Sequence, residues 1–194
     1  MNDYLIIGAG FLGRELMSWC HNARVTTVNR KIKKAKEHVL RFPKITAIAH
    51  DVINEGHNKQ TRSVISKFKG TMFCLLPPSA FGQDDVDGSI SKLISFLEGS
   101  CITRAILISS TGVYSESQGG KTVYDSCTSA RDFRSERLLH IEERWNQSKW
   151  HSVIVRLAGI YGKERVVGRT LLKEKKPLTK ITKDSTLLFF HIFY

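Results

Sequence analysis

The chain has 194 residues, of which 41% are hydrophobic and 25% charged, with a formal net charge of +12. This length suits one large domain, or one domain with part of another, and the hydrophobic fraction is sufficient for a sizeable core. No stretch approaches the ~18 to 20 apolar residues that cross a bilayer, and no basic segment precedes a cleavage site near the N-terminus. We therefore expect neither a membrane span nor a signal peptide.

The cysteines are widely spaced and include no C-x-x-C pair. They are Cys20, Cys74, Cys101 and Cys127. This spacing fits a reduced environment better than a disulfide framework, and we therefore expect a cytoplasmic protein.

The positive charge is concentrated in residues 30–44 and 163–183, which each carry a net charge of +6. Such segments can bind a polyanion such as nucleic acid or a membrane surface. Neither segment interleaves aromatic residues that could stack on bases. We favour a solvated helix face and a basic tail, expect no membrane or nucleic-acid partner, and keep salt-dependent DNA binding as a third alternative.

Short apolar runs rich in β-branched residues alternate with segments of helical period. The expected strands are residues 3–8, 24–29, 45–49, 71–76, 104–109 and 152–156. The expected helices are residues 11–22, 31–41, 59–68, 86–98 and 130–147. Leu12, Leu16 and Trp19 give the first helix its apolar spacing. This alternation predicts an α/β fold with a doubly wound parallel sheet of order 3-2-1-4-5-6 and helices on both faces.

The segment GAGFLG places Gly8, Gly10 and Gly13 at the spacing G-x-G-x-x-G, between the first strand and the first helix. In this context the first glycine permits a tight turn, the second lets a diphosphate approach the backbone, and the third lets the helix pack closely on the sheet. The N–H groups at the start of the helix then attract phosphates. The sequence predicts a dinucleotide site here, with Phe11 and Leu12 in the same turn; a turn without a ligand is the alternative.

The second strand ends at Asn29, where an acid would bind the ribose 2′-hydroxyl of NAD. Asn29 does not repel a phosphate, and Arg30 beside it can hold a 2′-phosphate through a forked, charge-assisted contact. We therefore predict NADP as the cofactor, with NAD as the alternative and simple solvent exposure of Arg30 as the other interpretation. Asp51, just past the third strand, either lies near the adenine or is a surface turn acid.

Four motifs occur in order: GAGFLG, CLLPPSA, LISSTGVYS and VRLAGIYG. Together they resemble the extended short-chain dehydrogenase/reductases, the NAD(P)-dependent epimerase/dehydratase group. The LLPPS segment and the lack of a Tyr-x-x-x-Lys pair resemble its atypical, YeeZ-like branch. The resemblance covers residues 3–165 and implies a Rossmann fold that binds a nicotinamide dinucleotide across the strand ends, with Leu76 and Pro77 at the cofactor.

The resemblance also implies an active-site hydroxyl at Ser110, with Thr111 beside it, to polarise a substrate carbonyl or alcohol. In the family, a Tyr passes the proton and a Lys lowers the pKa of that Tyr. With Glu142 taken as the acid of that helix, the Tyr position falls on Arg134 and the Lys position on Leu138. The chain therefore departs from the family at its proton-transfer pair.

Two functions stay open. The first is an oxidoreductase or epimerase that acts on a small-molecule substrate, a nucleotide sugar or a similar polar carbonyl compound. The second is an NADP(H)-binding sensor or scaffold without turnover. The histidines show no zinc-ligand spacing, so we expect no metal, and a homodimer stays open. We assign residues 1–162 to the dinucleotide-binding domain, and residues 163–194 to the remnant of a short or truncated substrate lobe or to a basic tail.

Overall fold

The computed structural model describes residues 3–20, 22–55, 59–82, 85–114, 133–161 and 189–191. The strands are β1 (Asp3–Ile7), β2 (Arg24–Asn29), β3 (Thr46–Ala49), β4 (Lys69–Cys74), β5 (Cys101–Ser110), β6 (His151–Leu157), β7 (Gly159–Tyr161) and β8 (Phe189–His191). The α-helices are α1 (Phe11–Trp19), α2 (Ile32–Arg41), α3 (Lys59–Ile65), α4 (Val86–Phe96) and α5 (Phe133–Asn146). Two single-turn helices are η1 (Pro78–Ala80) and η2 (Thr111–Val113).

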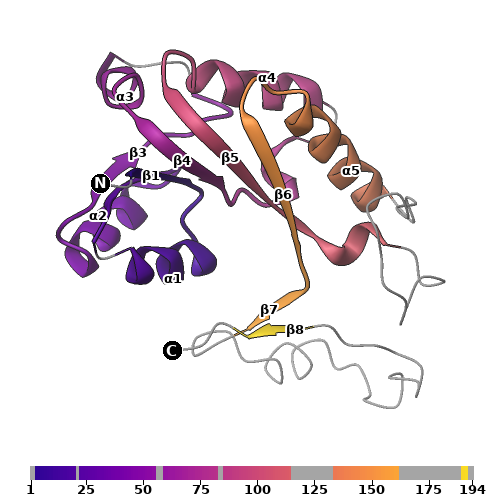
Figure 1. The fold of residues 1–194 in the computed structure, drawn as a ribbon, viewed down its shortest axis with the longest axis horizontal. Coiled ribbons are helices and arrows are strands. Elements are labelled where there is room, and N and C mark those ends of the chain that lie inside the picture. Colours follow the sequence, from indigo (N-terminus) through magenta and orange to yellow (C-terminus); the bar gives the residue numbers. More distant parts are fainter. Residues whose placement is uncertain are drawn as a thin grey trace.

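Six of these strands form one parallel sheet of order β3-β2-β1-β4-β5-β6, which confirms the predicted Rossmann-type architecture (Figure 1). The chain order reverses between β1 and β4, so their connections leave in opposite directions and open a crevice at the carboxyl ends of the strands. Ile7 is level with Val28 on one side and with Cys74 on the other. The loops that follow these three strands therefore meet at the same edge of the sheet.

Alternate residues of the central strands supply two cores, one on each face of the sheet. Leu5 and Ile7 belong to the larger core, which α4 and α5 cover with residues such as Leu93 and Trp145. Ile6 faces the smaller core beneath α1. Figure 1 shows α1 and α2 on one side of the sheet and α4 and α5 on the other. Because each fully buried Leu or Ile stabilises the fold by about 1.5–3 kcal/mol, the two cores hold the sheet edge in place from both sides.

The apolar face predicted for the first helix is wrong at Trp19, whose side chain is 66% exposed. The buried positions of α1 include Gly13 and Met17, one turn apart. Trp19 lies about 200° around the helix from Met17, because each residue turns an α-helix by about 100°. The helix therefore packs on the sheet through a small residue rather than through its largest one.

A strand that the sequence did not indicate lies near the C-terminus. β8 pairs in parallel with β7 in a separate two-stranded sheet, with Gly159 level with Phe189. Residues 189–191 are the only part of the tail beyond residue 163 among the described residues. Among the helices in the described ranges, none combines the length and apolar character needed to cross a bilayer.

Candidate functional site

Gly8 makes the turn between β1 and α1. Its φ of +81° is in the left-handed region, and a Cβ there would lie 3.0 Å from Leu76 Cδ2 and 3.1 Å from the Leu76 backbone nitrogen. The Gly8 N–H donates to the Val28 carbonyl at 2.9 Å, and the Gly10 N–H donates to the Gly8 carbonyl at 2.7 Å. Glycine at position 8 is thus required by both the backbone conformation and the adjacent loop.

Gly13 lies where α1 crosses the sheet, and a Cβ there would come within 2.9 Å of Ala9 Cβ and 3.2 Å of Leu75 Cδ1. Gly10 differs, because a Cβ there would find only the Gly8 carbonyl oxygen, at 3.9 Å. The space in front of Gly10 is therefore open, and a side chain at this position would project into it.

The N-terminus of α1 faces this open space without a capping side chain. The N–H groups in the first turn of an α-helix, here those of Phe11, Leu12 and Gly13, have no carbonyl partner within the helix. Their direction and the helix dipole favour an anion at this point. A diphosphate is the part of a dinucleotide that suits a turn of this construction.

Two cavities, of about 420 and 430 Å³, extend to either side of the Gly-rich turn. Both are bounded by Gly8, Gly10, Leu76 and Pro77. We call the one beside β2 and β3 the first cavity and the one beside β5 and β6 the second cavity. The two cavities therefore lie on either side of the turn, along the carboxyl ends of the strands.

The first cavity brings together Asn29, Arg30 and Asp51, the residues expected at the ribose and adenine. It is also lined by Lys31 and Lys34, and Arg30 and both lysines are exposed. The first cavity therefore has a basic rim. Such a rim favours a ligand with a phosphate at this end.

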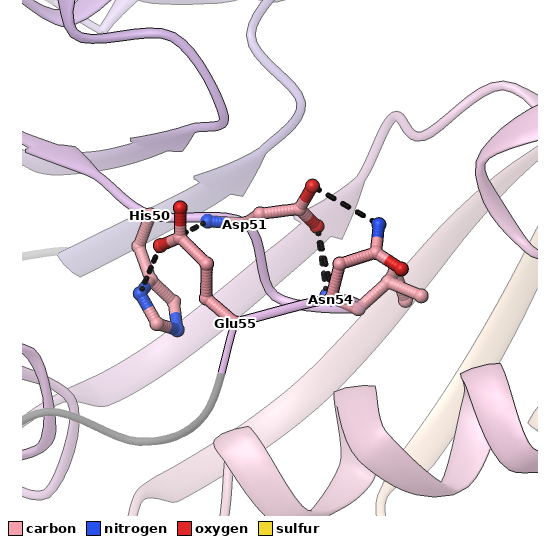
Figure 2. A network of polar contacts seen from close by, with 5 residues as sticks. His50, Asp51, Asn54 and Glu55 are labelled. Carbon is pink, nitrogen blue, oxygen red and sulfur yellow. Dashed lines mark hydrogen bonds and ion pairs between the residues drawn. The ribbon is translucent and has the colours of Figure 1, made fainter.

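Asp51 uses both carboxylate oxygens to hold its own turn, as Figure 2 shows. Oδ1 accepts from the backbone N–H groups of Ile53 and Asn54, and Oδ2 accepts from Asn54 Nδ2, each at 3.1 Å. Burial acts to raise the pKa of Asp51, but these hydrogen bonds and the charge of Arg30 hold it below its ordinary value. Asp51 thus lines the cavity as an ionised turn acid whose oxygens are already engaged.

His50 lies beside this turn and was not expected at the site. It is 2% exposed, stacks on Phe96 with ring centroids 5.1 Å apart, and lines the first cavity. Its Nδ1 is 3.1 Å from Glu55 Oε2, within ion-pair distance but without hydrogen-bond geometry (Figure 2). Only its position directly before Asp51, at a strand end, could have indicated this placement.

The second cavity brings together Ser110, Thr111 and Arg134, the residues expected at the reacting end. Phe11, Leu12 and Leu138 also line it. Ser110 Oγ accepts from the Gly112 N–H at 3.1 Å, and its own O–H, which can donate, has no acceptor among the described residues. Arg134 and Leu138, one turn apart on α5, thus occupy the cavity wall where the family resemblance places its Tyr and Lys.

An ion pair between Arg156 and Glu142, which the sequence did not indicate, contacts Tyr114 at the end of η2. Arg156 on β6 donates from Nη2 to Glu142 Oε2 at 2.7 Å and from Nε to Glu142 Oε1 at 3.1 Å. It also donates from Nη1 to Tyr114 Oη at 3.1 Å. The hydrogen bonds from Arg156 to Glu142 raise the pKa of Arg156. Tyr114, the residue after η2, is therefore bound to Arg156 through its hydroxyl oxygen.

Cys127 lies outside the described residues. Within the described ranges, no group of three or more His, Cys, Asp or Glu side chains is arranged to hold a metal ion. Cys74 is fully buried, and burial raises its pKa to about 12, so its thiol is unreactive.

No protein-family model and no curated protein matches the chain. Solved structures do match its fold. A protein of Methylobacillus flagellatus described as an NAD-dependent epimerase/dehydratase is 24% identical, with a TM-score of 0.61; the match covers 91% of this chain and 62% of that one. UDP-glucuronic acid 4-epimerase of Bacillus cereus, in complex with UDP-glucuronic acid and NAD, is 16% identical, with a TM-score of 0.63 and coverages of 91% and 64%.

UDP-N-acetylglucosamine 4-epimerase of Methanobrevibacter ruminantium M1, in complex with UDP-N-acetylmuramic acid, is 18% identical, with a TM-score of 0.63 and coverages of 86% and 59%. At these identities the similarity establishes the fold. The chain spans less than two thirds of the length of each of these three proteins.

Proposed function

We propose that the chain binds a nicotinamide adenine dinucleotide along the crevice formed by the two cavities. The observation that carries this proposal is the turn at Gly10, where open space faces the uncapped start of α1 and a cavity extends to each side. The diphosphate would lie at the turn, the adenosine in the first cavity and the nicotinamide in the second. This arrangement supports membership of the extended short-chain dehydrogenase/reductases, and we extend the proposal to their YeeZ-like branch.

We propose NADP(H) rather than NAD(H) as the preferred cofactor. Arg30, Lys31 and Lys34 surround the ribose end of the first cavity. Asp51, the only carboxylate among the described residues that line the first cavity, accepts three hydrogen bonds from its own turn, which leaves it one acceptor position, on Oδ2, for a 2′-hydroxyl. A 2′-phosphate would gain charge-assisted contacts from the basic rim.

The proposed reaction is a redox step on a nucleotide sugar or a similar polar carbonyl compound. The bound nicotinamide would supply the hydride donor or acceptor. Ser110 would donate its hydroxyl hydrogen to the substrate oxygen, and Thr111 would offer a second hydroxyl beside it. Arg134 would orient an oxygen of the substrate by donating from its guanidinium, which does not exchange protons near neutral pH. The solved structures with nucleotide sugars have the same fold, which supports this substrate class.

The alternative is an NADP(H)-binding sensor or scaffold that does not turn over. The observation that favours it is the wall of the second cavity, which Arg134 and Leu138 line, the two residues that the family resemblance aligns with the proton-transfer pair. Leucine cannot lower the pKa of a neighbour, and arginine keeps its proton. Cytoplasmic location and a homodimer remain predictions.

Calorimetric titration with NADP⁺ and NAD⁺ tests the binding proposal. Gly10→Val should abolish binding of both nucleotides while the melting temperature stays close to that of the parent, because its side chain enters open space. Arg30→Ala should weaken NADP⁺ at least about tenfold and leave NAD⁺ nearly unchanged, since it removes a charge-assisted contact. Arg41→Ala is the matched control, an exposed arginine on α2 outside both cavities.

If the parent protein binds neither nucleotide, the proposal fails. If it binds NADP⁺ but Arg30→Ala and Arg41→Ala behave alike, only the 2′-phosphate assignment fails. Nicotinamide absorbance during incubation with a panel of UDP-sugars then separates the enzyme from the sensor. Turnover that Ser110→Ala abolishes supports the enzyme, and tight binding without turnover supports the sensor.

A further inference from the structure

The Asn29 side chain connects the first cavity to a buried histidine. Asn29 Nδ2 lies 3.2 Å from Nδ1 of His38 on α2 and 3.5 Å from Thr27 Oγ1. Asn29 is 5% exposed and His38 is 2% exposed. The amide therefore has fixed partners inside the protein, while its residue forms part of the wall of the first cavity.

His38 is neutral in the fold at neutral pH. Burial, with the charges of Lys34 and Arg14, holds the pKa of His38 below its ordinary value of 6.5, against an opposing effect of Glu37. A neutral imidazole with its proton on Nε2 accepts at Nδ1, so Asn29 donates to it through Nδ2. The side-chain atom of Asn29 left for the cavity is then Oδ1, which accepts no hydrogen bond within the described part of the chain.

The charged groups that act on His38 lie on α2 and α1. The strands that α2 contacts, β2 and β3, contribute no charged group near His38. β3 contains no titratable residue, and β2 contains only Arg24, at its opposite end and paired with Asp3. A change in the protonation of His38 therefore acts first on the side-chain amide of Asn29, its hydrogen-bond partner.

We propose that His38 is a positioning residue for cofactor choice, which acts through the orientation of the Asn29 amide. The proposal rests on the dinucleotide function proposed above. While His38 is neutral, Asn29 Oδ1 faces the adenosine ribose and accepts from its 2′-hydroxyl, which is free in NAD and phosphorylated in NADP. Arg30 acts in the opposite direction by attracting a 2′-phosphate.

When His38 takes up a proton, the side-chain amide of Asn29 reverses its orientation. A protonated His38 donates at Nδ1, so Nδ2 of Asn29 can no longer donate to it, and the amide turns so that Oδ1 accepts from the imidazolium. The NH₂ group then faces the cavity, where it donates to a 2′-phosphate oxygen and no longer accepts from a 2′-hydroxyl. Acidification thus shifts the preference of the first cavity from NAD towards NADP.

The experiment measures Kd for NAD⁺ and NADP⁺ by calorimetry from about pH 5.5 to about pH 8, across the range in which a histidine titrates. The matched variant is His38→Gln, whose side-chain carbonyl can accept from Asn29 Nδ2 but does not titrate. The 2′-phosphate itself titrates near pH ~6, but it does so equally with both proteins and cancels in the comparison. Circular dichroism at each pH confirms that both proteins are folded.

In the parent protein, the ratio of Kd for NAD⁺ to Kd for NADP⁺ should rise on acidification by about 3- to 10-fold more than in His38→Gln. Asn29→Leu gives an independent test, because it removes the amide and leaves His38 able to titrate. The pH dependence of its Kd ratio should match that of His38→Gln. Equal pH profiles for the parent and His38→Gln, or a parental profile in Asn29→Leu, would overturn the proposal. A parent protein that binds neither nucleotide would instead refute the dinucleotide function.

Discussion

The buried pair of Glu142 and Arg156 permits a quantitative prediction for Glu142→Gln. The Glu142 side chain is 5% exposed and that of Arg156 is 14% exposed. Removal of one partner from a buried ion pair destabilises a protein by about 3–5 kcal/mol, because the other charge is left without compensation. Arg156 would keep its hydrogen bond to Tyr114 and its position 5.2 Å from that ring, so we expect the lower end of the range, about 3 kcal/mol.

For a chain of this size, 1 kcal/mol corresponds to about 2–4 °C in melting temperature, so Glu142→Gln should melt about 6–12 °C below the parent protein. Glu143→Gln is the matched control, because Glu143 is the next residue of α5 and is exposed. Its free energy of unfolding should change by less than about 0.5 kcal/mol. Urea denaturation of both variants, followed by circular dichroism, gives the two free energies.

The double variant Glu142→Gln/Arg156→Met tests the cause. With both charges removed, no buried charge is left unpaired, so part of the lost stability should return relative to Glu142→Gln. Two results would refute the reasoning: a Glu142→Gln variant as stable as Glu143→Gln, or a double variant less stable than the single one.

Three further predictions concern the fold around the crevice. Gly13→Ala should lower the free energy of unfolding by about 1–3 kcal/mol, because its Cβ would overlap Ala9 Cβ, and thermal denaturation measures this. Asp51→Asn should destabilise the protein by about 1 kcal/mol at neutral pH. Since the pKa of Asp51 is lowered in the fold, this difference should disappear as pH falls below 3.8 through the folded-state pKa, in urea titrations at each pH. Trp145→Phe should cost about 1–3 kcal/mol in urea denaturation, because it leaves the buried carbonyl of Ala105 without its donor.

The sheet could be predicted because its strands are apolar runs, and every strand of the sheet except β4 has a clear end. Residues 75 and 76 continue the apolar run of β4, yet the strand ends at Cys74. Leu75 then packs against the smaller core and Leu76 packs over Gly8, so both residues are apolar because they form a wall of the crevice. Hydrophobicity alone cannot distinguish a strand from the wall that follows it.

The position of the first cavity could be predicted because the residues expected there lie at or just past strand ends. Asn29, Arg30 and Asp51 owe their positions to parallel strands that end at one edge, which chain order alone makes evident. The contacts of Arg156 with Glu142 and Tyr114 could not be predicted. Arg156 on β6 is 14 residues from Glu142 on α5 and 42 residues from Tyr114 after η2, and no local pattern in the sequence marks contacts over such separations. The orientation of Asn29 towards His38 was hidden for the same reason.

The three glycines of the turn differ in how strongly each indicates a bound ligand. Gly8 is required by its φ of +81° and Gly13 by its distance from Ala9, so a protein with this fold would need both even if it bound nothing. Gly10 meets neither requirement, because a Cβ there has open space around it. A diphosphate against the first turn of α1 does need a residue without a side chain at this point, because a side chain would occupy its place. Gly10→Val therefore tests the ligand separately from the fold, and a variant that keeps both its melting temperature and its NADP⁺ affinity would remove the main argument for the site.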